Sequence, residues 1–147
     1  MQQVLDASLA SASRLTQSLF AGPRWTAGQA SDFINSVRQI TVATVSARGE
    51  PHAATAICAC LDGVIHFTAS HGSALLGNLR RDPKVAFTIT DQSHGIIGRG
   101  VTVLAGKSLE AHDLVDRLAA ATRKGTFTPA GWDGYIYAVT LDRLFAS

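Results

Sequence analysis

The spacing of hydrophobic residues divides the chain into a helical start and a strand-rich remainder. Within residues 2–20 the large apolar side chains recur at intervals near 3.6 residues, which predicts a helix that ends at Gly22-Pro23. These side chains are Val4, Leu5, Leu9, Leu15 and Leu19. Residues 27–36 predict a second, shorter helix that packs through Phe33 and Ile34.

Beyond residue 38 the apolar positions gather in runs of β-branched residues, which favour strands. The runs predict six strands, over residues 39–46, 51–60, 64–68, 85–90, 96–104 and 135–145. Asp62-Gly63 is a hairpin signal between the second and third strands. Two further helices are predicted, one from Ser73 to about Arg81 and one over residues 108–123 with Ser108 as its N-cap.

Most of the predicted strands follow one another through hairpins, which implies antiparallel pairing. Six short antiparallel strands without a dedicated helical layer usually close into a barrel, because closure removes exposed sheet edges. A length of 147 residues fits one domain with an ordinary hydrophobic core. We therefore expect a mainly β barrel with short flanking helices.

Composition narrows the choice of partners. Apolar residues make up 46% of the chain and charged residues 16%, which excludes global disorder and favours a subunit interface over a solitary monomer. The net charge of +2 differs from that of a basic nucleic-acid-binding protein. The chain has neither a membrane-spanning apolar run nor a signal peptide. We expect a cytoplasmic protein with neither nucleic acid nor membrane as a partner.

The cysteines Cys58 and Cys60 lie two residues apart on a predicted strand, so their side chains share a face at roughly 6–7 Å. A disulfide between them is awkward, and no other residues complete a zinc site. Two buried thiols in a reducing compartment is the favoured interpretation, and we expect no metal site.

The segment His66–Pro83 has the features of an anion-binding turn. His71-Gly72-Ser73 leads from a strand into a short helix, whose first N–H groups and partial positive charge suit a phosphate. The same residues also fit a turn whose serine only caps the helix. The segment alone leaves both interpretations open.

Familiar constellations of catalytic residues are missing from the sequence. It contains no Ser-His-Asp set, paired carboxylates or G-x-S-x-G motif, so the catalytic residues are unknown. Phe20, Trp25 and Phe33 are able to shape a substrate pocket, although core packing explains them equally well.

Several motifs in one order resemble the pyridoxamine 5′-phosphate oxidase-like split-barrel family of flavin- and deazaflavin-binding proteins. The resemblance covers about residues 33–146. Its motifs are the G-x-P-H turn of Gly49, Pro51 and His52, the Asp62-Gly63 hairpin, the strand end Phe67, Thr68 and Ser70, the run Asn78 to Pro83, Gly100, and the final Tyr137, Val139, Thr140, Asp142 and Arg143.

This resemblance implies a six-stranded antiparallel split β-barrel of the Greek-key type that forms a homodimer with cofactors at the interface. It divides the chain into an N-terminal helical extension, residues 1–32, and a flavin-binding split-barrel domain, residues 33–147. FMN is the expected cofactor, with deazaflavin F420 or haem as alternatives. The implied activity is that of a flavin-dependent oxidoreductase acting on an unknown small molecule.

The resemblance also implies which residues contact the cofactor. Ser73 faces the phosphate, strand residues line the isoalloxazine ring, and Trp132 closes the pocket from its own or the partner chain. The implied cofactor-binding residues are Thr55, Ala56, Ile57, Phe67, Thr68, Ala69, His71, Ser73, Leu75 and Trp132.

One departure from the family pattern concerns the phosphate. Family members that bind the phosphate tightly commonly carry S-R-K or similar after the turn, whereas this chain has Ser73-Ala74-Leu75. His71 is one substitute donor, and Arg99 or His94 of a partner subunit are others, while Arg80 and Arg81 are expected to lie too far round the helix. The departure supports the alternative of a non-enzymatic binding module. Gly77 within this helix suggests close approach by another group.

Overall fold

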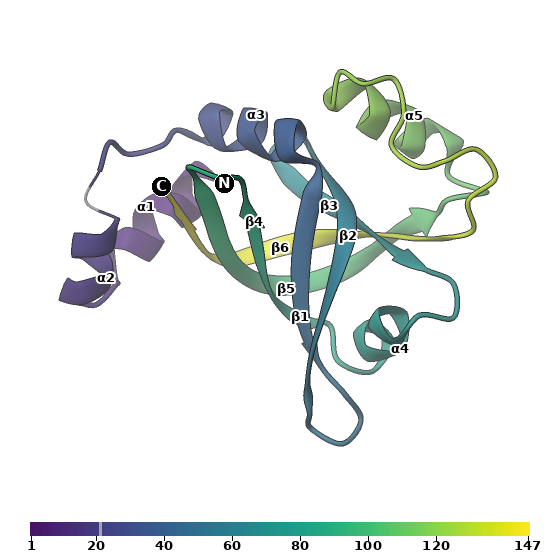
Figure 1. Ribbon diagram of the computed structural model, residues 1–147, viewed down its shortest axis with the longest axis horizontal. Coiled ribbons are helices and arrows are strands. Elements are labelled where there is room, and N and C mark those ends of the chain that lie inside the picture. Colours follow the sequence, from purple (N-terminus) through teal and green to yellow (C-terminus); the bar gives the residue numbers. More distant parts are fainter. Residues whose placement is uncertain (21) are drawn as a thin grey trace.

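The computed structural model, which describes residues 1–20 and 22–147, contains six strands that close into an antiparallel barrel with five helices around it (Figure 1). The order of strands around the barrel is β1-β2-β3-β6-β5-β4. The strands are β1 (Gln39–Val45), β2 (Pro51–Leu61), β3 (Val64–Ser70), β4 (Lys84–Thr90), β5 (Gly95–Lys107) and β6 (Gly134–Ala146). The predicted barrel class is confirmed.

The barrel interior holds the core because alternate residues of each strand point inward. Both β1 and β4 alternate strictly between exposed and buried positions. The inward side chains form one apolar cluster with members such as Ile40, Val42, Phe87, Ile89 and Ile96. Asp62 and Gly63 both have positive φ in the β2–β3 turn, which confirms the predicted hairpin.

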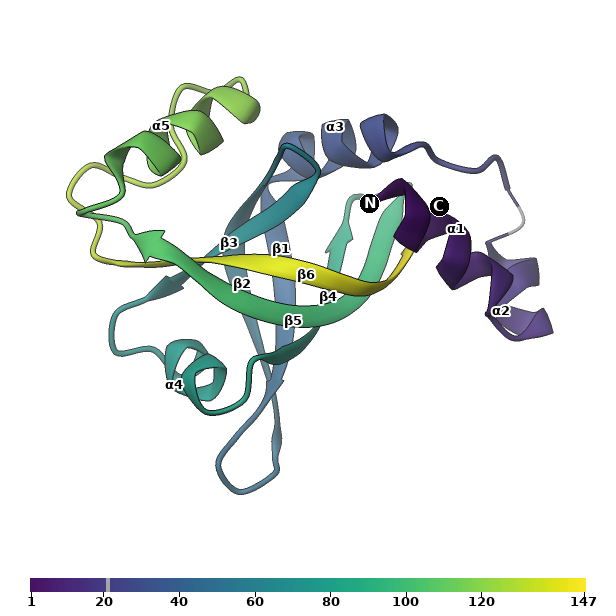
Figure 2. The same ribbon diagram turned by 180° about the vertical axis from the view of Figure 1, so that it is seen from behind.

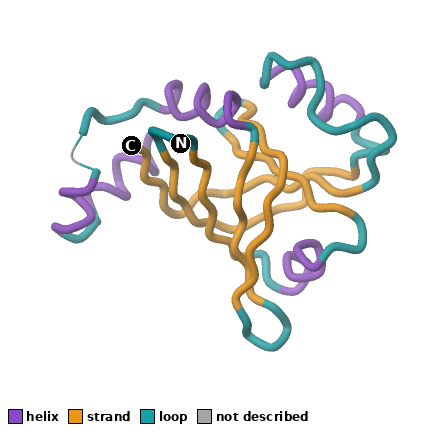
Figure 3. Tube along the Cα trace, viewed as in Figure 1, coloured by secondary structure: helices purple, strands orange, loops and turns teal. Residues whose placement is uncertain are grey.

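Helices lie on the outside of the strands (Figure 3). They are α1 (Gln2–Ala10), α2 (Arg14–Leu19), α3 (Ala27–Val37), α4 (Ala74–Arg81) and α5 (His112–Ala121). Helix α1 packs on β6, and α3 and α5 both pack on β2. The two termini lie side by side (Figure 2), since the Ser8 hydroxyl accepts a hydrogen bond from the Leu144 N–H at 2.9 Å.

The prediction of one helix over residues 2–20 is wrong. The chain forms two helices, because the side chain of Ser13 accepts a hydrogen bond from the Thr16 N–H and caps a new helix. Leu5 joins the barrel core, so α1 is integrated with the strands. The division at residue 32 stays a prediction, and within its first part Ala21 lies outside the described residues.

The predicted N-cap at Ser108 is also wrong. Helix α5 begins at His112, and Ser108 lies just beyond the end of β5. Its buried hydroxyl donates to the Trp132 carbonyl at 2.7 Å and accepts from the Gly134 N–H at 3.0 Å. Ser108 therefore joins the ends of β5 and β6, a role that depends on segments distant in sequence.

Candidate functional site

A pocket lies where β2 and β3 separate on the outer face of the barrel. The two strands pair only between Cys58↔Phe67 and Leu61↔Val64. Beyond that point β2 pairs with β1 alone, and β3 continues against β6. The pocket has a volume of about 320 Å³ and is lined by Gln39, Thr55, Ala56, Ile57, Thr68 and Ser70. We call it the β2–β3 groove.

The side chain of Thr68 supports this separation. Its hydroxyl oxygen accepts a hydrogen bond from the Ile57 N–H at 3.3 Å, at the first residue of β2 beyond the ladder with β3. Thr68 is only 7% exposed. A buried N–H without a partner is costly, so the hydroxyl replaces the missing backbone acceptor and lets the strands part.

The groove leads into the turn before α4. Ser70 lines the groove, and the next residues include Gly72, whose φ of 75° needs a residue without a Cβ. The Ser73 side chain accepts from the Leu76 N–H at 3.1 Å and caps α4. The first N–H groups of a helix have no intrahelical acceptors, so this turn presents donors beside the groove.

Next to this turn, the side chains of Arg80 and His71 both pack on the ring of Tyr135. The Arg80 guanidinium lies 4.9 Å from the centroid of the Tyr135 ring. The His71 ring stacks on Tyr135 at 6.4 Å between centroids. Its position in the helix sequence predicted that Arg80 lies too far from the turn. Arg80 lies near the turn nevertheless, because its side chain packs on Tyr135 of β6, on which His71 also stacks.

The indole of Trp132 lies at the same end of the groove in its own chain. Gly134 pairs with Ser70 across the β3–β6 ladder. A Cβ on Gly134 would come within 2.2 Å of the indole Cη2, so the ring rests directly on the glycine. The bonds of Ser108 to residues 132 and 134 hold this turn in place.

Some implied site residues come together and others do not. Thr55, Ala56, Ile57 and Thr68 line the groove, and His71, Ser73 and Trp132 lie near its β3 end. The side chains of Phe67, Ala69 and Leu75 are buried in the barrel core. Five consecutive residues of β3 are buried, so its pattern does not show which face each residue occupies.

Sequence reasoning passed over Gln39 and Tyr135 as neighbours of the site. Gln39 lines the groove because it pairs with Ile57. Tyr135 pairs with Ala69, near the end of β3, and so lies beside His71 and Arg80 at the turn. Both placements follow from strand register, which the linear sequence does not display. Ser70 had a local signal, since it closes the strand-end motif.

The electrostatics of the groove are mild. None of its six lining residues is charged, and Arg80 supplies the nearby positive charge. Burial raises the pKa of Tyr137, and Arg80 opposes that increase. The other residues proposed to supply charge have partners in their own chain: Arg99 pairs with Asp142 at 2.9 Å, and His94 Nδ1 lies 3.7 Å from Asp91 Oδ1.

Cys58 and Cys60 are free thiols buried in the main hydrophobic core, which confirms their interpretation as buried thiols. Burial, followed by the neighbouring Cys60, raises the pKa of Cys58 to about 12. Such a thiol stays protonated at neutral pH and is a poor nucleophile. No group of three metal-ligating side chains occurs within residues 1–20 and 22–147, and no helix there is long and apolar enough to span a bilayer.

Comparison with known families agrees with this geometry. The family model described as pyridoxamine 5′-phosphate oxidase matches residues 27–128, more than half of the chain. The chain belongs to this family. None of the curated proteins matches it significantly in sequence.

Solved structures of similar fold carry names that refer to different cofactors. An FAD binding protein from Mycobacterium smegmatis is 16% identical, with a TM-score of 0.59, over 84% of this chain and 95% of that one. An F420 reductase is 22% identical, with a TM-score of 0.60, over 76% and 92%. A heme binding protein from M. smegmatis is 20% identical, with a TM-score of 0.60, over 85% and 55%. At these identities the likeness establishes the fold and leaves the cofactor open.

The run from Asn78 to Pro83 illustrates how a family motif serves the fold. Asn78 donates to the Thr44 hydroxyl at 3.0 Å in a buried hydrogen bond, and Arg81 donates to the Val45 carbonyl. The Pro83 carbonyl accepts from the Thr102 N–H and hydroxyl. These bonds attach α4 and the following turn to β1 and β5. Arg80 is the member of the run that faces the candidate site.

Proposed function

We propose that this protein binds a flavin, FMN in the first place, along the β2–β3 groove and acts as a flavin-dependent oxidoreductase. The observation that carries the proposal is the groove itself, an uncharged pocket that leads directly into a turn of backbone donors. An uncharged surface suits a planar ring, and the turn suits its phosphate. The family membership and the FAD- and F420-related neighbours support a cofactor of this class.

The residues of the groove and the adjoining turn fit such a group. Thr55, Ile57 and Thr68 would lie along the ring, with Trp132 at its end. Ser73 and the N–H groups at the start of α4 would face the phosphate, with Arg80 or His71 providing charge in place of the missing cations. A bound flavin supplies the redox chemistry, while the protein binds, orients and shields it.

We also propose a homodimer formed through the outer face of β1, β4 and β5. On this face Ile97, Val101 and Val103 of β5 are 49%, 43% and 57% exposed. Strand β4 pairs with β5 on one side and with β1 on the other. The outward side chains that adjoin those of β5 are Ala86 and Thr88 of β4, followed by Thr41 and Ala43 of β1. Lys84 and Arg99 are its charged members on β4 and β5. Such a surface suits burial against a second copy.

The test compares FMN with riboflavin, which lacks the phosphate, by difference spectroscopy. Ser73→Asp keeps a good helix cap but adds a negative charge, so FMN binding should weaken at least about ten-fold while riboflavin binding changes little. Ser73→Asn keeps the cap without the charge and serves as the control. Equal weakening of both ligands would place the phosphate elsewhere, and no spectral change with either ligand would reject the flavin.

A second candidate is a binding module without its own redox activity, which takes FMN weakly or prefers a different cofactor such as deazaflavin F420 or haem. It is favoured by the start of α4, where Ala74 is exposed and Leu75 is buried, so neither provides a cation. Purified protein that is yellow and bleaches with dithionite supports the oxidoreductase. Colourless protein that ignores FMN but gives a spectral shift with F420 or haemin supports the module.

A further inference from the structure

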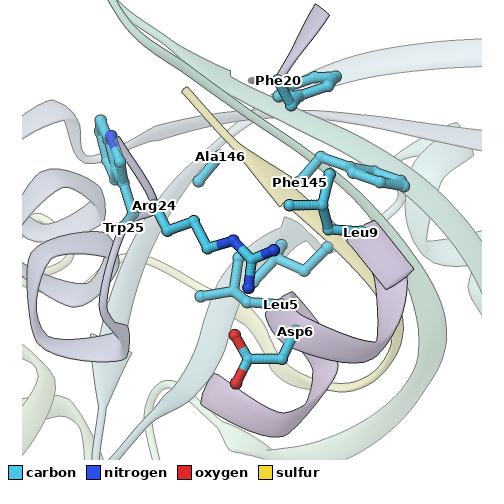
Figure 4. Close-up of a pocket in the computed structure, with 9 residues that line it drawn as sticks. Leu5, Asp6, Leu9, Phe20, Arg24, Trp25, Phe145 and Ala146 are labelled. Atoms are coloured by element: carbon cyan, nitrogen blue, oxygen red, sulfur yellow. The ribbon is translucent and has the colours of Figure 1, made fainter. Parts of the chain in front are cut away.

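The pocket between the N-terminal helices and the end of β6 is too small for an organic ligand. Its lining includes Asp6, Arg24 and the rings of Phe20, Trp25 and Phe145 (Figure 4), and its volume is about 30 Å³. Such a space holds only a few water molecules. The β2–β3 groove, with a volume of about 320 Å³, is within the range of small-molecule sites, so ligand selection is expected from the residues next to it.

Tyr135 occupies a rigid position beside the turn before α4. It lies on β6, where it pairs with Ala69 of β3 on one side and with Lys107 of β5 on the other. Its side chain is half-buried and packs against the main hydrophobic core. The two ladders and this packing leave the ring little freedom, so a group that stacks on the ring is held in place as well.

Arg80 carries a positive charge that no acidic side chain of the described chain neutralises. Its guanidinium carbon lies 4.9 Å from the centroid of the Tyr135 ring, within the range of a cation–π interaction. Among the described residues Arg80 takes part in no ion pair within 4.0 Å, whereas Arg99 and Arg117 each pair with an aspartate at 2.9 Å. A guanidinium over an aromatic ring keeps the N–H groups at its edges free, and these suit a phosphate.

The same ring also contacts the turn through His71. The His71 ring stacks on Tyr135 with 6.4 Å between the centroids and 23° between the planes, and the His71 N–H donates to the Asp133 carbonyl at 3.4 Å. Tyr135 therefore contacts the segment before α4 through His71 and the last turn of α4 through Arg80. An arginine from the C-terminal end of the helix is thereby kept near the donors at its N-terminal end.

We propose that Tyr135 is a positioning residue, which holds the Arg80 guanidinium beside the turn so that the arginine binds the phosphate of a flavin. In this role Tyr135 makes the site select phosphorylated flavins, although it does not contact the phosphate itself. An arginine that is already ordered loses less side-chain freedom when a ligand binds, so more of its attraction appears as affinity. The role rests on the proposed binding of a flavin in the β2–β3 groove.

The test compares FMN with riboflavin in variants of the two residues, by difference spectroscopy. Arg80→Met removes the charge and should weaken FMN binding at least about ten-fold. Tyr135→Leu keeps an apolar side chain but removes the ring, and should weaken FMN binding about two- to five-fold. Riboflavin has no phosphate, so its affinity should stay close to that of the parent in both variants. Tyr135→Phe keeps the ring and should bind FMN like the parent.

A double variant separates positioning from direct support of the fold. In an Arg80→Met background, Tyr135→Leu should weaken FMN binding no further, because contacts that act through one group are not additive. Arg80→Lys, at an exposed position where folding should be unaffected, keeps the charge without the planar guanidinium and should also lose affinity for FMN. Arg48→Met, in the exposed β1–β2 turn, is the matched control and should bind like the parent.

The outcomes separate the positioning role from the flavin proposal on which it rests. Losses in Tyr135→Leu that are equal for FMN and riboflavin, or that add to those of Arg80→Met, would mean that the tyrosine supports the fold and would overturn the role. FMN binding that is unchanged in Tyr135→Leu or in Arg80→Lys would overturn the role and leave the flavin in the groove. A parent protein that gives no spectral change with either ligand would reject the flavin, and the positioning role with it.

Discussion

At the residue scale, one hydroxyl decides how the barrel opens. Thr68 takes the place of a strand partner for the Ile57 N–H, at the point where the groove begins. Threonine is common on strands, so the importance of Thr68 comes from its place beside the end of the β2–β3 ladder. The same position can therefore be tested through stability without any ligand.

Thr68→Val removes the acceptor and leaves a partly buried N–H unpaired. We expect the free energy of unfolding to fall by about 1–3 kcal/mol, measured by urea denaturation. Thr68→Ser keeps the hydroxyl and should recover the part of the loss that belongs to the hydrogen bond. A valine variant as stable as the parent would contradict this account of the groove.

His66 makes stability depend on pH. The side chain is 8% exposed and its Nδ1 lies 3.0 Å from the Val64 carbonyl. Burial lowers the pKa of His66, the carbonyl contact partly opposes this, and Arg117 adds to the lowering. The unfolded chain therefore binds the proton more readily than the folded protein.

Because the folded pKa is depressed, the stability contribution of His66 is complete above the unfolded pKa of about 6.5. It is lost as the pH falls from there through the lower pKa of the folded protein. Unfolding free energies measured between pH 8 and pH 5 should decline less steeply in His66→Gln than in the parent. His112→Gln, at an exposed position of α5, is the control and should follow the parent curve.

At the scale of elements, α4 combines a structural task with the candidate site. Asn78 and Arg81 attach it to β1, while Arg80 lies against Tyr135. Gly77 occupies its interior, and a Cβ built there would find no described atom within 4 Å apart from its chain neighbours and the backbone of its own helix. The close approach that this glycine suggested is not made by any other described element of its own chain.

Gly77→Ala should therefore raise the free energy of unfolding of the cofactor-free protein by about 0.5–1 kcal/mol, because alanine favours the helix. Thermal or urea unfolding checks this. If a flavin or a partner approaches the glycine, the same variant should weaken FMN binding or dimer formation. A destabilised variant would show that the helix has less room than its surroundings indicate.

At the scale of the whole molecule, the outer face of β1, β4 and β5 is the surface that we propose for contact between subunits. Thr88 lies near its middle, paired with Thr41 on one side and Ile97 on the other. Helices cover other parts of the barrel, with α1 packed on β6 and α5 on β2. A second copy of the chain is the partner that we propose for this face.

Thr88→Arg would bring two like charges into such an interface and should shift the protein from dimer to monomer, because desolvating unpaired charges is unfavourable. Light scattering coupled to gel filtration measures the mass directly. Gln92→Arg, in the β4–β5 turn, introduces the same charge outside the proposed interface and should leave the mass unchanged. A monomeric parent protein, or a Thr88→Arg variant that remains dimeric, would reject this interface.

Local patterns were sufficient for the strands and for the hairpin at Asp62-Gly63, because alternation and turn chemistry act over a few residues. They failed where a distant partner intervenes. Ser108 looked like a helix cap, yet it bonds to residues 132 and 134. Residues 2–20 had helical spacing throughout, but Ser13 capped a second helix.

The candidate site divides in the same way. The sequence by itself determined the barrel class, the family, and a glycine-serine turn before a helix, since these depend on short motifs. Only the tertiary structure decided that β2 and β3 part at Thr68, that Phe67 points into the core, and that Tyr135 brings Arg80 near the turn. The physical reason is strand register, which sets the neighbours of every side chain through pairings between distant segments.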